Sequence, residues 1–423
     1  MTDPDDLLFP PGAAGVLAVI FCVSIVLMSA LVAAGCGGKD DVRSSLVDAA
    51  VVADVDAANV DTGDASVGPC AVDVPAVDAG SCATGELAVA PTSTIATPDP
   101  APRNPILTAS PSSDDFLAVW SDGTEESLGA IWASVLQPSA GGASATPVVQ
   151  LSTMGTCPVA TWTNAGFAVA WADSTGLELQ QLEPHGALVG SSVRVLSGAG
   201  SMCAMSIASA GTGLALAWSS GASGSIESVA LVDASGAAGA SIVLGTVAPG
   251  AGADIALAEL GDQTYAAYLE WPDTSSETAV ARIDWSLASA VPVGTAPGFL
   301  QSFVAADNQL WLATESGGQY ALYTAAPGAA LQLAGQGCAA FDDLAVDGCG
   351  QLLGVGNSGF NPGGAAAFYA QAIGGAGSQV ALGAASELAV AGAASTFGVL
   401  WFAGIGGGAS QNGALSFTTL SWK

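Results

Sequence analysis

Carboxylates are the reactive side chains that this sequence offers in quantity. It has 37 Asp and Glu, only 6 Lys and Arg, and a formal net charge of −31 over 423 residues. Its one histidine, His185, lies in the turn segment EPHGA. Because Ser-His-Asp triads, paired-histidine metal sites and most general-base designs need histidine, we expect a structural role for His185. Acid–base chemistry in this chain would have to come from carboxylates.

Two groups of carboxylates stand at recurring places beside apolar segments. Four lie at the start of such segments: Asp254, Asp342, Asp343 and Glu387. Four others follow such segments: Asp122, Asp173, Asp273 and Glu315. Two carboxylates at a defined separation would serve a glycosidase, and several converging oxygens would bind Ca²⁺. Solvated charge is the simpler interpretation, so the first four are weak candidate metal ligands, and we assign no catalytic residue and no cofactor.

The scarcity of cations excludes one class of partner. Proteins that bind nucleic acids neutralise phosphates with Lys and Arg and release counterions. With so few basic residues we expect no nucleic-acid partner, and the excess of negative charge favours solubility through mutual repulsion.

The segments that must position these residues repeat along the chain. One apolar phrase occurs seven times: FLAVW (116), FAVAW (167), LALAW (214), YAAYL (265), LWLAT (310), LLGVG (352) and FGVLW (397). The copies recur at intervals of roughly 40 to 50 residues, which is typical of propeller blades. Large residues alternate with Ala in FAVAW, which predicts a strand buried on both faces between neighbouring sheets.

Each copy is surrounded by further strand-like runs. PVATW and LELQQL stand before and after FAVAW, and a fourth run such as SVRVLS closes most copies. Short runs rich in β-branched and aromatic residues, separated by Gly, Ser, Asn and Asp, indicate antiparallel strands. Four strands per period predict an all-β fold, a seven-bladed β-propeller of four-stranded antiparallel blades over residues 85–423. WD, kelch, YWTD and sialidase signatures are absent from the sequence, so no specific propeller family is matched.

The two ends of this region predict how the ring closes. The seventh copy ends at Lys423 after its third strand, whereas GELAVAP at 85–91 is a strand without a blade of its own. If the amino-terminal strand completes the last blade, no long sheet edge stays exposed.

Six cysteines follow the amino-terminal region: Cys70, Cys82, Cys157, Cys203, Cys338 and Cys349. An even number without a C-x-x-C pair or a histidine partner indicates disulfides in an oxidising compartment rather than zinc. Cys157 and Cys203 open the innermost strands of adjacent repeats, so we expect them to pair. We also expect Cys70 to pair with Cys82. By elimination, we predict that Cys338 pairs with Cys349.

The amino terminus carries an apolar run over residues 13–34, which ends in AAGC at Cys36. This arrangement resembles the lipobox of bacterial lipoproteins, which implies a signal peptide over residues 1–35 and a lipid on Cys36. Ala33 stands where Leu is commonest in that family, and the leader MTDPDDLLFPPG is acidic where positive charge is usual. A misassigned start would explain the acidic leader.

An uncleaved membrane helix is the alternative for the same run, because it is long enough to span a bilayer. Lys39 and Arg43 would then stay in the cytoplasm with the rest of the chain. The cysteine usage argues against that topology.

Residues 36–84 are rich in Ala and Asp and contain no aromatic residue. Such a segment cannot bury enough apolar surface to offset its ordering entropy, so it predicts a flexible, disordered acidic spacer. Its Ala- and Asp-rich composition resembles that of surface lipoproteins of myxobacteria. Its Asp spacing does not meet the pattern of a calcium-binding loop.

These features favour a non-catalytic binding or scaffold module, because the chain offers a rigid ring and a tether without a catalytic signature. We expect a monomeric lipoprotein of the cell envelope, held by its lipid to the outer membrane or cell surface or on the periplasmic side, with a protein or glycan ligand. Two alternatives stay open, since fold alone does not decide function. One is a carbohydrate-active enzyme that uses axial carboxylates, and the other is an outer-membrane assembly factor with an exposed apolar patch or sheet edge.

Overall fold

β-Strands account for every regular element in the described part of the chain. The computed structural model describes residues 86–96, 103–122, 128–198, 203–220, 225–247, 254–270, 275–306, 308–338, 341–357, 367–373, 379–384, 387–403 and 414–422. In these ranges we find no helix with the length and hydropathy that a membrane crossing requires. The predicted signal peptide, Cys36 and the predicted spacer lie outside the described residues.

Four of the sheets are separate antiparallel blades in which spatial order follows chain order. Blade 3 comprises β11 (Met205–Ala210), β12 (Gly213–Ser220), β13 (Ser225–Val232) and β14 (Ile242–Val247). Blade 4 comprises β15 (Ile255–Leu260), β16 (Gln263–Glu270), β17 (Glu277–Asp284) and β18 (Ser289–Pro297). Blade 5 comprises β19 (Phe299–Ala306), β20 (Gln309–Ser316), β21 (Gln319–Ala325) and β22 (Gln332–Cys338). Blade 6 comprises β23 (Asp343–Val346), β24 (Leu352–Asn357), β25 (Ala367–Ile373) and β26 (Gln379–Ala384).

Blades 1 and 2 are joined through one long strand. Blade 1 comprises β3 (Arg103–Ala109), β4 (Phe116–Ser121), β5 (Gly129–Ser139) and the first part of β7 (Val149–Thr163), with β6 (Gly142–Ala145) added beside β5. The second part of β7 begins blade 2, which continues with β8 (Gly166–Asp173), β9 (Gly176–Leu182) and β10 (Leu188–Ser197). The pairing of β7 with β8 is irregular between Thr156 and Val159, where Cys157 has a φ of 50°. This bend lets one strand leave one blade and enter the next.

Blade 7 is completed from the other end of the chain, which confirms the predicted closure. Its own strands are β27 (Leu388–Gly392), β28 (Phe397–Ala403) and β29 (Ala414–Trp422). The outer edge of β29 pairs antiparallel with β1 (Leu87–Val89) and then with β2 (Ser93–Ala96). The Thr418 hydroxyl also donates a hydrogen bond to the Ala90 carbonyl at 2.7 Å.

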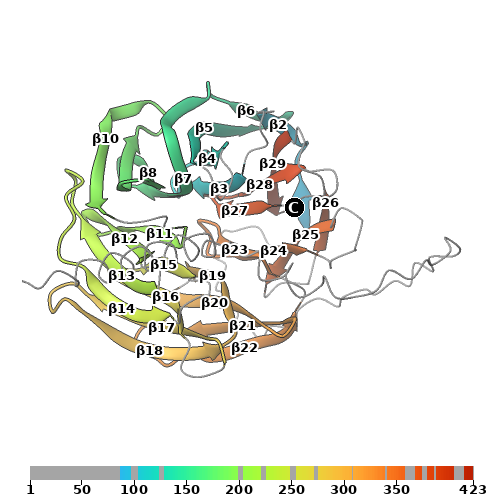
Figure 1. Cartoon of the computed structure of the whole chain (residues 1–423). Helices are drawn as coiled ribbons and strands as arrows, with labels where there is room; N and C mark the ends of the chain where they lie inside the picture. Colours follow the sequence, from blue (N-terminus) through green and yellow to red (C-terminus); the bar gives the residue numbers. More distant parts are fainter. Residues whose placement is uncertain are drawn as a thin grey trace, which may run out of the picture. The chain divides into compact units, whose positions relative to one another are not determined.

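The innermost strands contact one another in sequence and close a ring. β3, β7, β11, β15, β19, β23 and β27 each contact the next, and β27 contacts β3. Figure 1 shows these strands toward the centre, with β10, β14, β18 and β22 on the outside. Within the described residues the fold is therefore the predicted seven-bladed propeller.

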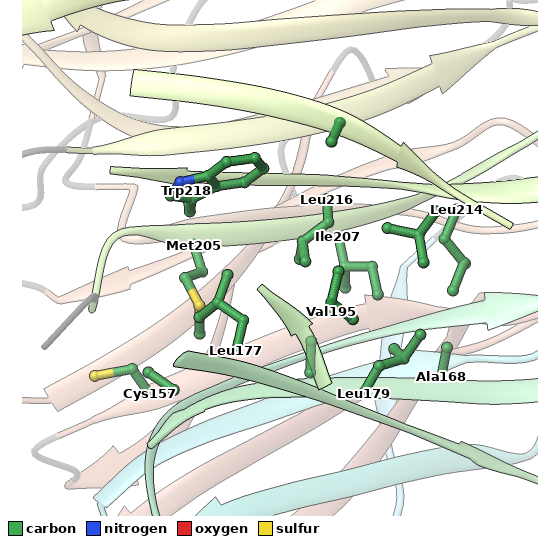
Figure 2. Close-up of a cluster of buried hydrophobic side chains, with 14 residues drawn as sticks. Cys157, Ala168, Leu177, Leu179, Val195, Met205, Ile207, Leu214, Leu216 and Trp218 are labelled. Atoms are coloured by element: carbon green, nitrogen blue, oxygen red, sulfur yellow. The ribbon is translucent and has the colours of Figure 1, made fainter. Parts of the chain in front are cut away.

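The core lies between blades, and the repeated phrase explains why. In β8 the large residues Phe167, Val169 and Trp171 pack against blade 1. The alternate residues Ala168, Ala170 and Ala172 face blade 3, where they meet the larger side chains of β12. Figure 2 shows this second interface, in which Leu214, Leu216 and Trp218 lie opposite side chains of blade 2. Small side chains on one sheet thus leave room for large ones on the next.

The closure predicts a position-dependent effect of mutation in β1. Leu87 is 7% exposed and packs in the core between blades 6 and 7, whereas Val89 on the same strand is 43% exposed. We expect Leu87→Ala to lower the free energy of unfolding by about 2 to 3 kcal/mol, because a buried leucine is lost. Val89→Ala should change it by less than about 0.5 kcal/mol. Denaturant unfolding of both variants measures the difference, and equal effects would mean that β1 does not seal the ring.

Candidate functional site

The carboxylates predicted to lie near the axis are placed at the beginnings of innermost strands. Asp343 begins β23, Asp342 precedes it, and Asp254 and Glu387 directly precede β15 and β27. All four are half-buried. Among the described residues, no group of three or more His, Cys, Asp or Glu side chains is arranged to hold a metal ion.

Asp343 connects three neighbouring innermost strands. Its Oδ1 accepts hydrogen bonds from the Ser302 hydroxyl of β19 and from the Leu344 N–H, both at 2.9 Å. Its Oδ2 accepts the N–H of Val390 in β27 at 3.2 Å. Three donors from successive blades therefore hold this carboxylate in place, which is a structural use of its charge.

The same connection recurs at equivalent positions in other blades. The Ser206 hydroxyl of β11 accepts the N–H of Leu257 in β15 at 2.9 Å, and the Ser302 hydroxyl accepts the N–H of Leu344 at 3.1 Å. An innermost strand has an unpaired backbone edge toward the axis, and its buried N–H groups need acceptors. Polar side chains at this register position supply them.

Glu387 has a comparable role between the last blade and the first. Its Oε2 accepts the N–H of Asn104, at the beginning of β3, at 2.7 Å. Asn104 has a φ of 50°, a conformation that asparagine tolerates better than most residues. The hydrogen bond thus helps to hold the bend with which the chain enters blade 1.

The carboxylates predicted farther from the axis bond to their own blades. Asp122 accepts the indole N–H of Trp132 at 3.0 Å, and Glu315 accepts the N–H of Gly318 at 2.6 Å. Asp173 accepts the N–H groups of Thr175 and Gly176 and forms an ion pair with Arg194 at 2.8 Å. Asp273 lies outside the described residues. The hydrogen bonds of their own hairpins account for the positions of Asp122, Glu315 and Asp173.

One carboxyl group that sequence reasoning missed is Glu227 in β13. It is fully buried at the interface of blades 3 and 4, and neither of its oxygens has a hydrogen-bond partner among the described residues. The pKa of Glu227 is raised from 4.5 to about 9. Burial has the largest effect, followed by the negative charge of Asp254, and the charge of Glu270 has a smaller effect. The nearby Leu269 N–H, which donates its hydrogen bond to the Asp254 carbonyl, lowers the pKa of Glu227, but by less than burial raises it. Ile226 beside it is 44% exposed. The hydropathy of the two residues predicts the opposite arrangement, with Ile226 buried and Glu227 exposed.

The disulfide between Cys157 and Cys203 is present as predicted, with a Cα–Cα distance of 5.0 Å. It joins the beginning of blade 2 to the segment before β11 of blade 3. Cys349 is also in a disulfide, whose second cysteine lies outside the described side chains. Cys70, Cys82 and the side chain of Cys338 are likewise outside them. His185 is exposed in the turn between β9 and β10.

A groove of about 450 Å³ lies between the outer strand of blade 4 and blade 5. Its lining includes Pro297 of β18, Thr314 and Ser316 of β20, Gln319 and Tyr323 of β21, and Gln336 of β22. Its volume is within the range of small-molecule sites. The groove lies at the end of blade 5 where β20 turns into β21, on the same face as the carboxylates that begin the innermost strands.

Comparisons with known proteins find similarity among solved structures only. No protein-family model matches the chain, and no curated protein matches it in sequence. Among solved structures, a Dos1 propeller is similar with a TM-score of 0.45 and 12% identity, covering 80% of this chain and 96% of that one. A subtype N10 neuraminidase-like protein of A/little yellow-shouldered bat/Guatemala has a TM-score of 0.42 and 8% identity, covering 64% of this chain and 95% of that one.

Glu227 predicts an unusual dependence of stability on pH. The unfolded chain would lose this proton near pH 4.5 and the folded chain only near pH 9, so stability is greatest at low pH and falls as pH rises between these values. Glu227→Gln preserves the shape of the protonated side chain and removes the titration. We expect the variant to be more stable than the wild type at about pH 7, by up to about 3 kcal/mol, and nearly equal to it at about pH 4.5.

Denaturant titrations across that pH range make the measurement. Glu183→Gln, at an exposed turn of blade 2, is the matched control and should keep the wild-type slope. Parallel curves for wild type and Glu227→Gln would show that Glu227 does not stay protonated in the folded chain.

Proposed function

We propose that this chain is a lipoprotein of the cell envelope whose propeller is a non-catalytic binding module. The observation that carries the proposal is the use of the axial carboxylates. Asp343 and Glu387 accept hydrogen bonds from backbone N–H groups of neighbouring strands. A glycosidase needs one carboxyl group to donate a proton and a second to attack or to activate water. In this chain Asp343 and Glu387 instead hold neighbouring innermost strands together, which is a structural use of these side chains.

Two observations support the compartment. Cys157 and Cys203 are bonded, and disulfides persist in oxidising compartments outside the cytosol. The AAGC segment at Cys36 follows an apolar run, as in lipoproteins, and residues 36–84 would act as the spacer between lipid and ring. Binding would then use the face on which the groove of blade 5 lies.

Affinity capture from envelope extracts tests the binding function. We expect the full chain, purified in detergent, to retain a glycan or a protein from the extract without altering it chemically. Capture should be equal with Ca²⁺ and with a chelator, because the described carboxylates do not converge on a cation. A shortened glycan in the eluate would instead indicate an enzyme, and an unfolded outer-membrane protein would indicate an assembly factor.

Lipid attachment has its own test. Expressed in a bacterium with a labelled fatty acid, the wild-type chain should take up label and lose residues 1–35, whereas Cys36→Ser should do neither. Cys22→Ser, within the apolar run, is the matched control and should be labelled like the wild type. A wild-type chain that keeps residues 1–35 and takes up no label would show an uncleaved anchor.

A further inference from the structure

The turn that joins β23 to β24 in blade 6 holds a bonded cysteine. We call residues 347–351 the axial turn of blade 6; Cys349 is half-buried in it, and its sulfur is in a disulfide. Oδ1 of Asp347 accepts the N–H groups of Cys349 and Gln351, each at 2.9 Å. These hydrogen bonds hold the backbone at Cys349 in place, so the second cysteine of the disulfide has to reach this point.

The axial turn of blade 6 leans on blade 7, at the face opposite the groove. The Gly348 N–H donates to the Ala393 carbonyl, in the turn between β27 and β28, at 2.6 Å. A side chain at Gly348 would meet the backbone of Ala394 in that same turn. Innermost strands begin on the groove face and end at these turns, so Cys349 lies on the opposite face, beside the space between blades 6 and 7.

Cys338, the partner that elimination predicts, stands far from this turn. It ends β22, the outermost strand of blade 5, and pairs with Tyr320 beside the turn between β20 and β21, on the groove face. Figure 1 shows β22 on the outside of the ring and β23 toward its centre. Three strand spacings separate an outermost from an innermost strand, roughly 14 Å, whereas the two Cα atoms of a disulfide lie within about 7 Å. The strand order therefore opposes a bond between Cys338 and Cys349.

The amino-terminal part of the chain enters the ring on the same face as the axial turn. Leu87, the first residue of β1, pairs with Trp422 at the end of β29, and β29 runs away from the groove face. The Leu87 side chain packs between blades 6 and 7 in a cluster that includes Leu353, which follows the axial turn directly in sequence. Cys82 precedes Leu87 by five residues. Five extended residues span up to about 17 Å, so Cys82 is able to reach Cys349.

We propose that Cys82 and Cys349 form a disulfide that clamps the chain before β1 to the axial turn of blade 6 and keeps the ring closed. Cys70 lies farther along the chain from Leu87, so bringing it to Cys349 costs more loop entropy. Forming the bond removes two protons and two electrons from the two thiols. A thiol oxidoreductase of the oxidising compartment accepts them by exchange, and its own disulfide is reduced to two thiols.

The clamp protects the closing strand when the chain is pulled, a use that rests on the proposed membrane tether. β1 has three residues, and beside it the Ala90 N–H donates to the Thr419 carbonyl at 2.9 Å. A pull on the chain before Leu87 would load these few hydrogen bonds one after another, as at any fraying chain end. With the disulfide in place, the pull acts on blade 6 through a covalent bond, and β1 stays paired with β29.

Peptide mapping without reduction tests the pairing in the full chain. The chain is expressed in a bacterium whose envelope forms disulfides, its free thiols are blocked, and it is cleaved at aspartate. Cleavage at aspartate separates the cysteines concerned, because Asp73 and Asp78 lie between Cys70 and Cys82, and Asp342, Asp343 and Asp347 lie between Cys338 and Cys349. We expect a linked pair of peptides that joins Cys82 to Cys349. A link from Cys349 to Cys70 or to Cys338, or a free thiol at Cys349, overturns the assignment.

A double variant tests what the clamp does. Cys82→Ser with Cys349→Ser removes the bond without leaving a new thiol. Residues 87–90 should then exchange their amide hydrogens at least tenfold faster than in the wild type, and the melting temperature should fall by several degrees. Cys70→Ser is the matched control and should exchange these amides at the wild-type rate. Equal exchange rates in the wild type and the double variant would show that the bond does not hold β1.

These measurements need neither the lipid nor a ligand, so failure of the clamp and failure of the proposed function are distinguishable. A Cys82–Cys349 link in a chain that carries no lipid would support the pairing and remove the tether. A lipid-labelled chain in which Cys349 bonds to another cysteine would remove only the clamp.

Discussion

Interlocking of large and small side chains between neighbouring sheets is the constraint on which this structure depends. A blade of four short strands has two apolar faces and is stable only when a neighbour covers each of them. In β8 the alanines face blade 3 and the aromatic residues face blade 1. The last blade is completed by the first residues of the ring, which is why β1 and β2 pair with β29. The packing between blades 7 and 1 is tight at Gly398, because a side chain there would meet the ring of Phe116 in blade 1.

The same stacking creates a problem at the axis and explains the use made of the acidic residues. Each innermost strand has only one hydrogen-bonded neighbour in its own sheet, so its other edge carries N–H groups without ladder partners. Side-chain oxygens of Ser206, Ser302 and Asp343 accept such groups from the next blade. Acidity near the axis is therefore partly a consequence of how blades are joined, and it is weak grounds for assigning catalysis.

The sequence was sufficient to predict the ring but not its side-chain contacts. Strand-like runs, their period and the spare strand near Leu87 are local patterns, and the structure confirms them. Cys157 and Cys203 were paired correctly because they open adjacent innermost strands. In blade 4, however, the hairpin register aligns Thr264–Tyr268, rather than Tyr265–Leu269, with Leu214–Trp218. A strand buried on both faces has no polar side to fix its phase, so a shift of one residue passes unnoticed. No local sequence pattern predicts the burial of Glu227, because that burial depends on contacts with another blade.

Comparison of the blades with one another reveals what a search for charged residues does not. Every interblade space meets the same packing requirement, so a blade that departs from the common residue must compensate or leave a void, and voids are costly. At Gly356 the compensation comes from Phe341. At Thr314 neighbouring groups cover the small side chain, which is 1% exposed, and its Oγ1 has no hydrogen-bond partner among the described residues. Natural proteins break their local packing rules mainly at functional sites. Thr314 is therefore the position at which blade 5 departs from the aromatic residue of five other blades, which is Trp120, Trp171, Trp218, Tyr268 or Trp401.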